Sequence, residues 1–238
     1  MSSATVPPFG AIFDWDGVII DSGKLHEESW RRLAKELGQT IAPDSFIRGF
    51  GMKSQQVISQ VHRWSQEPEE ILRLTNRKEE LYREILGETK ISPLSGVIEW
   101  LSRLRQASIP CAIASSTPRR NIELVLNRLN LKDFFAVVIA AEDVVHGKPN
   151  PEVFLKAAAR LDRPPGQAVV FEDAYVGIAA AHAAGMIAVA VATTHSENQL
   201  RGADLVVRRL DELSVEQVTK VLRTRKAESC LTTKGLGD

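Results

Sequence analysis

The sequence has little cysteine, no long apolar run and no net charge, and each of these absences narrows the possible functions. Only two of its 238 residues are cysteines, Cys111 and Cys230, so a disulfide-stabilised secreted fold is disfavoured. No apolar stretch approaches the roughly 20 residues that span a bilayer. The start, MSSATVPPFG, has no basic cluster followed by an apolar segment. We therefore expect no secretory signal and a cytoplasmic location.

The charge balance bears on the partners of the protein. Thirty basic residues match thirty acidic residues, so the formal net charge is zero. Such a chain lacks the usual electrostatic attraction for nucleic acid or for an anionic membrane, and we expect neither as a partner. A few local cations could still hold a small anion. We expect a monomer or a weak homodimer.

Six short apolar runs alternate with helical patterns along most of the chain. The runs are AIFDW, IPCAIAS, FFAVVIA, AVVFED, MIAVAVA and ADLVV. Apolar strands that alternate with helices predict an α/β fold in which helices cover both faces of a parallel sheet.

A helical stretch interrupts this alternation after the first strand. Its first pattern, SGKLHEESWRRLAKELG, has Ser22 as an N-cap candidate and Gly38 as a stop signal. A second pattern, PEEILRLTNRKEELYREILG, begins at Pro68 and ends at Gly87. We therefore predict a core domain and an inserted all-helical cap domain. The core would comprise residues 1–21 and 93–238, and the cap residues 22–92.

Polar side chains gather at the carboxyl ends of four predicted strands. In an open parallel sheet, ligands bind outside the carboxyl ends of the strands, so we expect these side chains to converge on one site. In chain order they are Asp14 and Asp16, then Ser115, Ser116 and Thr117, then Lys148, and finally Glu172 and Asp173.

The chemistry of these groups favours a metal ion together with a phosphoryl group. Carboxylates with spare oxygens suit a hard cation such as Mg²⁺, which binds few protein ligands plus a phosphate. A lysine, a hydroxyl group and the N–H groups of a helix N-terminus suit the phosphate itself. Asp14 and Asp16, one residue apart at the end of a buried strand, are tolerable only if a cation shares their site.

Taken singly, each motif also has an ordinary structural explanation. DWDG is a common turn, although a calcium-binding EF-hand loop is excluded because its twelfth position would be Leu25. IASST can cap a helix, GKPNP can be a solvated turn, and FEDAYVG can be an acidic pair favoured by a helix dipole. The occurrence of all four in order, each after a predicted strand, favours a functional site.

As an ordered set, DWDGVIIDS, IASST, GKPNP and FEDAYVGI resemble the four motifs of the haloacid dehalogenase superfamily. The helical insertion is similar to the C1-type cap of its β-phosphoglucomutase-like branch, which includes CbbY-like phosphatases. The resemblance covers about residues 9–223. It implies a Rossmann-like core with the first strand at the centre of the sheet and a C1 cap closing over the site.

The same resemblance implies a role for each motif residue. Asp14 would be the nucleophile that forms an aspartyl-phosphate, and Asp16 would act as general acid and then as general base. Ser115 and Lys148 would hold the phosphoryl oxygens. The ligands of Mg²⁺ would be Asp14, the backbone carbonyl of Asp16, Asp173 and, directly or through a water molecule, Glu172.

Residues of the predicted cap are expected to decide between a hydrolase and a mutase. His26 stands where mutases of this branch carry a histidine, although a surface histidine is an equal alternative. The loop GFGMKSQQ is similar to the mutase specificity loop, but no arginine stands near Lys53 and Ser54, and a lysine is not a bidentate fork. We therefore expect a Mg²⁺-dependent phosphatase of a small phosphorylated metabolite, such as a sugar or polyol phosphate, with a phosphosugar mutase as the alternative. The predicted substrate-binding residues are His26, Gly51, Met52, Lys53, Ser54 and Ser116.

Two other functional classes fit less well. A dehalogenase would attack carbon with Asp14 and would need neither Asp16 nor an acidic pair for metal. A non-catalytic binding protein on this scaffold usually lacks part of the motif set, which is complete here. Within the third motif, we predict a cis peptide bond between Lys148 and Pro149.

Overall fold

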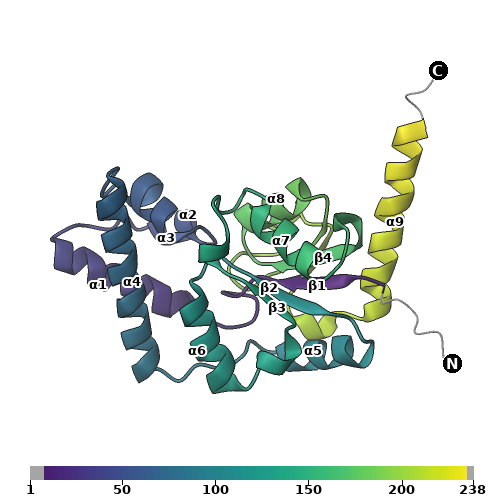
Figure 1. The fold of residues 1–238 in the computed structure, drawn as a ribbon, viewed down its shortest axis with the longest axis horizontal. Coiled ribbons are helices and arrows are strands. Elements are labelled where there is room, and N and C mark those ends of the chain that lie inside the picture. The colour runs from purple at the N-terminus through teal and green to yellow at the C-terminus, as the bar shows by residue number, and fades with distance from the viewer. Residues whose placement is uncertain (1–7, 235–238) are drawn as a thin grey trace.

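A six-stranded sheet forms the centre of the molecule in the computed structural model, which describes residues 8–234 (Figure 1). Its strands are β1 (Gly10–Phe13), β2 (Cys111–Ala114), β3 (Val137–Ile139), β4 (Ala168–Glu172), β5 (Ile187–Val191) and β6 (Leu205–Val207). They lie in the order β3-β2-β1-β4-β5-β6, and every neighbouring pair is parallel. Ile12 of β1 pairs with Ala112 of β2 and with Val170 of β4. The predicted parallel-sheet fold, with the first strand inside the sheet, is confirmed.

Burial explains why the strands read as continuous apolar runs. β1, β2, β4 and β5 are buried along their whole length, whereas the edge strands β3 and β6 are only partly buried. A strand covered on both faces needs apolar side chains at successive positions and not only at alternate ones. Each of the six predicted runs coincides with one observed strand, although β1 begins one residue before its run, at Gly10.

Helices cover both faces of the sheet. On one face, apolar residues of α5 (Val97–Gln106), α6 (Arg119–Leu129) and α9 (Val215–Lys234) join the core cluster that contains Phe13 and Phe171. On the other face, α7 (Glu152–Arg160) and α8 (Tyr175–Ala183) pack on Ile12 and Val170. Four single-turn 3-10 helices complete the described elements: η2 (Lys132–Phe134), η3 (Ala141–Asp143), η4 (Pro165–Gln167) and η5 (Leu210–Glu212).

Four α-helices and one π-helical segment separate β1 from α5 and form the part of the molecule at the left of Figure 1. They are α1 (Gly23–Leu37), α2 (Ser45–Gly49), α3 (Ser54–Gln56), the π-helical η1 (Val57–His62) and α4 (Pro68–Glu88). They share a hydrophobic cluster of their own, which includes Trp30, Leu33 and Leu81. Residues 22–92 as a separate domain stay a prediction, which this cluster supports, while Leu25, Tyr82, Ile85 and Leu86 pack in the core cluster with Phe13.

The sequence signals for the two long helices of this insertion are confirmed except for Gly87, which lies inside α4 one residue before its end at Glu88. Ser22 and Gly38 flank α1, and Gly38 adopts the left-handed conformation (φ 63°) that ends many helices. Pro68 is the first residue of α4. Within residues 8–234, no helix has both the length and the apolar character required to cross a membrane.

Candidate active site

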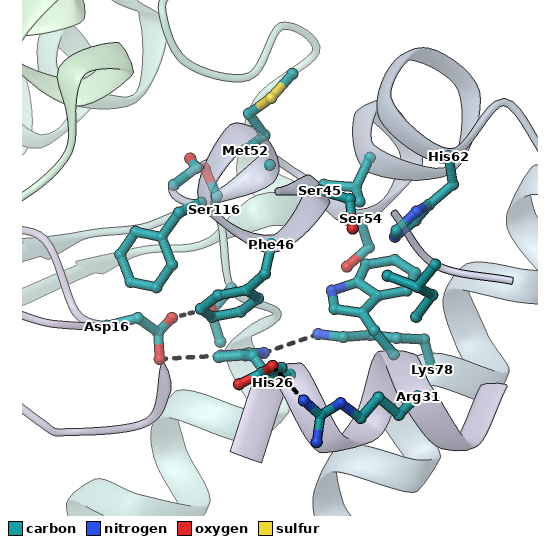
Figure 2. A pocket seen from close by; sticks show the side chains of 18 of the residues that line it. Asp16, His26, Arg31, Ser45, Phe46, Met52, Ser54, His62, Lys78 and Ser116 are labelled. Atoms are coloured by element: carbon teal, nitrogen blue, oxygen red, sulfur yellow. Dashed lines mark hydrogen bonds and ion pairs between the residues drawn. The ribbon is translucent and has the colours of Figure 1, made fainter. Parts of the chain in front are cut away.

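A cavity of about 430 Å³ lies between the carboxyl ends of β1 and β2 and the helical insertion. The core contributes acidic and hydroxyl side chains to its wall, and the insertion contributes aromatic and charged ones (Figure 2). Its volume is in the range of small-molecule sites in proteins. The lining residues on the core side are Asp14, Asp16, Ser115, Ser116 and Thr117.

The parallel sheet brings the motif residues together. Asp14 directly follows β1, and its backbone N–H donates to the carbonyl oxygen of Phe171 in β4 at 2.9 Å. Ser115 directly follows β2, and Glu172 is the last residue of β4. Because the carboxyl ends of parallel strands lie at one edge, three motifs that are far apart in the sequence meet there.

Lys148 joins two of the carboxylates. Its Nζ lies 2.7 Å from Asp14 Oδ1 and 2.7 Å from Glu172 Oε1, and all three side chains are buried. The Lys148–Pro149 peptide bond is cis, as predicted. Although burial opposes a charge on Lys148, the two carboxylates raise the pKa of its ammonium group above the ordinary value.

One lysine does not balance the negative charge of this site. Asp14, Glu172 and Asp173 each offer a carboxylate oxygen within 4.8 Å of the others. Burial, together with repulsion from Glu172 and Asp16, raises the pKa of Asp14 to about 7 in spite of Lys148. Burial and the charges of Glu172 and Asp14 likewise raise the pKa of Asp173 well above its ordinary value. The site therefore favours an additional cation.

Asp173 has a carboxylate oxygen available for such a cation. Its Oδ2 accepts a hydrogen bond from the hydroxyl of Thr194, whereas its Oδ1 is buried with no hydrogen-bond partner among the described residues. Gly17 allows this close packing: at φ +80°, a Cβ on Gly17 would lie 1.9 Å from Asp173 Oδ2. By contrast, Glu172 Oε2 already accepts the backbone N–H groups of Asp173 and Ala174, each at 2.7 Å.

Asp16 has a different environment from Asp14, although the two are one residue apart. The hydroxyl groups of Ser22 and Thr117 donate to its two oxygens. His26 Nε2 lies 3.1 Å from its Oδ1 (Figure 2). Burial opposes ionisation, but His26 and the two hydroxyl groups lower the pKa of Asp16 to about 2. The predicted N-cap, Ser22, thus flanks α1 but gives its hydroxyl hydrogen to the site and not to the helix.

His26 leads from Asp16 to a buried ion pair in the insertion. Its Nδ1 lies 2.9 Å from Lys78 Nζ, which also lies 2.9 Å from Glu79 Oε1 (Figure 2). Ser54 Oγ donates to Glu79 Oε1, and Asn121 of the core donates to Glu79 Oε2, each at 2.7 Å. Every charged group of this chain of contacts therefore has a partner.

The predicted substrate-binding residues divide into two groups. His26, Gly51, Met52, Ser54 and Ser116 line the cavity, and Ser116 Oγ donates to the carbonyl oxygen of Gly51 at 2.7 Å. Lys53 does not line it. Its Nζ crosses to the core and donates to the carbonyl oxygen of Val144 at 2.9 Å, which corrects the expectation that this charge faces the substrate.

Several cavity residues were not expected from the sequence. The place of Thr117 after the second strand predicts that it lies near the site, but neither its contact with Asp16 nor the Lys78–Glu79 pair has a signal in the sequence. A pattern of charged residues on an amphipathic helix is more typical of a solvated face, and α4 carries such residues on its exposed side as well. Trp30 follows the helical spacing of α1 and Phe46 lies in the five-residue α2, so neither position indicates in the sequence that the side chain faces a cavity.

Comparison with known proteins places this geometry among phosphate-ester enzymes. The family described as haloacid dehalogenase-like hydrolase matches residues 10–185. A 5-amino-6-(5-phospho-D-ribitylamino)uracil phosphatase, chloroplastic, from Arabidopsis thaliana is 40% identical over 92% of this chain, which spans 59% of the length of that relative. A validoxylamine A 7'-phosphate phosphatase from Streptomyces hygroscopicus subsp. limoneus is 32% identical over 85% of this chain and 94% of its own length.

A solved structure shares the same architecture. The crystal structure of β-phosphoglucomutase from Clostridium difficile superimposes with a TM-score of 0.81 and 27% identity, and the match covers 92% of this chain and 98% of that one. The likeness therefore includes the helical insertion as well as the sheet.

Proposed function

Because the chain belongs to the haloacid dehalogenase-like hydrolase family, we propose that it is a Mg²⁺-dependent phosphatase acting through an aspartyl-phosphate. Its substrate is a small phosphorylated metabolite, a phosphate monoester of a sugar or polyol. The observation that carries the proposal is the buried cluster of Asp14, Lys148, Glu172 and Asp173 at the end of a cavity that Asp16 also lines.

The carboxylate cluster fits a divalent cation. Asp173 Oδ1 is buried without a hydrogen-bond partner in the described part of the chain, and burial together with the neighbouring carboxylates raises the pKa values of Asp14 and Asp173. Asp14, Asp173 and the backbone carbonyl of Asp16 would hold Mg²⁺, with Glu172 acting through water because its oxygens are engaged. When bound, Mg²⁺ neutralises charge on the phosphoryl oxygens.

Asp14 is the nucleophile in the first step. Its carboxylate oxygen forms a bond to phosphorus while the bond from phosphorus to the ester oxygen breaks. Lys148 and Ser115 hold the remaining phosphoryl oxygens, which reduces the repulsion between two anions. Asp16 gives a proton to the leaving oxygen. The arriving phosphoryl dianion raises the proton affinity of Asp16, which otherwise has a pKa of about 2.

The second step regenerates the enzyme. Asp16, now ionised, takes a proton from a water molecule whose oxygen attacks the phosphorus of the aspartyl-phosphate. The bond between Asp14 and phosphorus breaks, and inorganic phosphate leaves. The low pKa of Asp16 favours the ionised form that this step requires. His26, 3.1 Å from Asp16, holds that carboxylate in place.

Residues 22–92 act as a cap in this proposal. They carry their own hydrophobic cluster, and polar contacts join them to the core, between Gly51 and Ser116 at the cavity and between Lys53 and Val144 outside it. A cap closed in this way excludes bulk water, which strengthens the electrostatic contacts inside.

The direct test is phosphate release from a panel of phosphorylated sugars and polyols. We expect release that EDTA abolishes, that Mg²⁺ restores, and that the Asp14→Asn variant lacks while it remains folded. Phosphate release that persists in the Asp14→Asn variant would show that Asp14 is not the nucleophile. Phosphate release that persists in EDTA would show that the reaction needs no metal ion.

A phosphosugar mutase is the second candidate, and the likeness to the β-phosphoglucomutase structure supports it. A mutase must bind a second phosphate in the same cavity. Trace sugar bisphosphate that accelerates isomerisation of a sugar phosphate, without net phosphate release, would favour this candidate over the hydrolase.

A further inference from the structure

The cavity is polar at one end and aromatic over much of the rest. Its wall includes Trp30, Phe46, Phe50 and His62, together called the aromatic wall below, and Figure 2 shows Phe46 on the side of Asp16 and His62 on the opposite side of the view. Trp30 and His62 have ring centroids 5.2 Å apart, and Phe46 and Phe50 have theirs 5.5 Å apart. Aliphatic side chains continue the same surface: Ile41, Met52 and Val57.

The two ends are connected by a short polar belt. Figure 2 shows Asp16 at one side of the view, His62 and Lys78 at the other, and His26 between Asp16 and Lys78. Lys78 Nζ lies 5.3 Å from the centroid of the Trp30 ring. A substrate with its phosphate at Asp14 would thus extend past hydrogen-bonding groups before it reaches Trp30.

Two cationic side chains among the described residues line the cavity, Lys78 and Arg31, and both are already paired with a carboxylate. Lys78 contacts Glu79 and His26, and Arg31 contacts Glu27 at 2.7 Å. Among the described lining residues there is therefore no lysine or arginine without a carboxylate partner to receive a second phosphate or a carboxylate of the substrate. An uncharged group fits this end better than an anion.

His62 does not change this conclusion. Burial, with the nearby charge of Arg48, lowers the pKa of His62 to about 4, so its imidazole is neutral near pH 7. It stacks on Trp64 with ring centroids 4.3 Å apart and an interplanar angle of 11°. The far end thus presents neutral aromatic surface.

We propose that the preferred substrate carries an uncharged, planar, unsaturated ring at the end of a polyhydroxylated chain, and that this ring binds against Trp30 and His62. The inference rests on the phosphatase function proposed above and adds the class of leaving alcohol. The hydroxyl groups of the chain meet the belt formed by His26, Lys78 and Ser54, and the ring meets the aromatic wall. Stacking on an aromatic side chain accepts many unsaturated rings, so the aromatic wall can hold such a ring without a charged partner.

The relative from Arabidopsis thaliana supports the same class. By its name it acts on a phosphate ester whose ribityl chain ends in a uracil ring, and it shares 40% identity with this chain. The packing role of Trp30 in the insertion does not conflict with this reading, because Trp30 both joins the insertion cluster and lines the cavity.

The test compares two esters that differ only in the ring. 5-Amino-6-(5-phospho-D-ribitylamino)uracil and D-ribitol 5-phosphate share the ribityl chain and the terminal phosphate. We expect kcat/KM to be at least about 10-fold higher for the ring-bearing ester, the range of a single stacking contact. The preference should appear mainly in KM, because ring contacts are alike in the ground and transition states.

Three variants assign the preference to the wall. Trp30→Leu and His62→Leu should each lower kcat/KM for the ring-bearing ester by about 5-fold or more. They should leave D-ribitol 5-phosphate within about 3-fold of the native value, which a merely structural role would not spare. The control is Leu72→Ala at an exposed position of α4, which should change neither ester. If Trp30→Leu fails to fold, His62→Leu alone decides.

The outcomes separate the two proposals. Equal kcat/KM for the two esters would overturn the ring site and leave the phosphatase intact. Phosphate release from no ester would overturn the phosphatase. In that case, calorimetry with the Asp14→Asn variant decides the ring site: tighter binding of the ring-bearing ester than of D-ribitol 5-phosphate keeps it, and equal binding overturns it.

Discussion

Two aspartates one residue apart should respond in opposite directions to the same substitution. In the metal-free protein the pKa of Asp14 is raised from 3.8 to about 7, chiefly by burial. The folded state therefore binds this proton more tightly than the unfolded chain, and stability is lost as the pH rises from about 4 to about 7. A shift of this size corresponds to about 4 kcal/mol. Asp14→Asn removes the charge and should stabilise the protein above pH 7.

The expected gain is smaller than the full electrostatic figure. Lys148 loses one of its two carboxylate partners, and Glu172 alone remains beside it. We therefore expect Asp14→Asn to raise the free energy of unfolding by about 2 kcal/mol at pH 8, roughly half of the limit set by the pKa. The gain should shrink steadily as the pH falls toward 4.

Asp16→Asn is the matched control because the pKa of the Asp16 carboxyl group is lowered from 3.8 to about 2. The stability that ionised Asp16 contributes is present above about pH 4 and is lost only as the pH falls toward about 2. The same substitution should thus destabilise the protein by about 2 kcal/mol, with no pH dependence between 5 and 8. Burial opposes its charge, but His26, Ser22 and Thr117 more than compensate.

Urea unfolding in EDTA from pH 5 to pH 8.5 measures both effects, since a bound cation would mask the cost of ionised Asp14. The reasoning is refuted if Asp14→Asn is less stable than the native protein at pH 8. It is refuted equally if the two variants change in the same direction.

Three further changes probe other contacts. Lys148→Met leaves buried carboxylates unpaired, so we expect the free energy of unfolding at pH 7, measured with urea, to fall by about 3 kcal/mol. We expect kcat, measured by phosphate release, to fall at least about 10²-fold, and an unchanged kcat would contradict the role of Lys148. Gly17→Ala places a Cβ against Asp173, so the Mg²⁺ concentration for half-maximal activity should rise about 10-fold or more, and an unchanged Mg²⁺ titration would contradict this. Lys53→Met removes the hydrogen bond to Val144, so KM should rise about 2- to 5-fold with kcat nearly unchanged; a large fall in kcat would instead indicate a role in the chemistry.

The sheet and the convergence of the motifs follow from the sequence because both depend on local patterns and on one topological rule. Continuous apolar runs mark buried parallel strands, and parallel strands align their carboxyl ends. The sequence alone therefore predicts that Asp14, Ser115 and Glu172 lie at the carboxyl-terminal edge of the sheet. The ends of α1 were equally accessible, because Gly38 acts within its own turn.

Contacts between distant side chains could not be predicted in this way. Ser22 has the position of a helix cap, but Asp16 competes for its hydroxyl hydrogen, and only the folded chain decides between them. The sequence shows that Lys53 is charged but not where its side chain points. That direction depends on a hydrogen bond to the carbonyl oxygen of Val144, 91 residues away in the sequence. The short helices α2 and α3 contain too few residues for a periodic pattern to be detected.

Hydrogen bonds join the insertion to the core at and beside the cavity. Their strength affects how fast the insertion can open to exchange substrate and product. Lys53 with Val144, and Ser116 with Gly51, are single contacts that water can replace, each with a net strength of about 1 kcal/mol. Such single contacts open more readily than the apolar contacts by which Leu25, Tyr82 and Leu86 of the insertion join the core cluster. The insertion can therefore close to exclude water during the reaction and open again to release phosphate after each turnover.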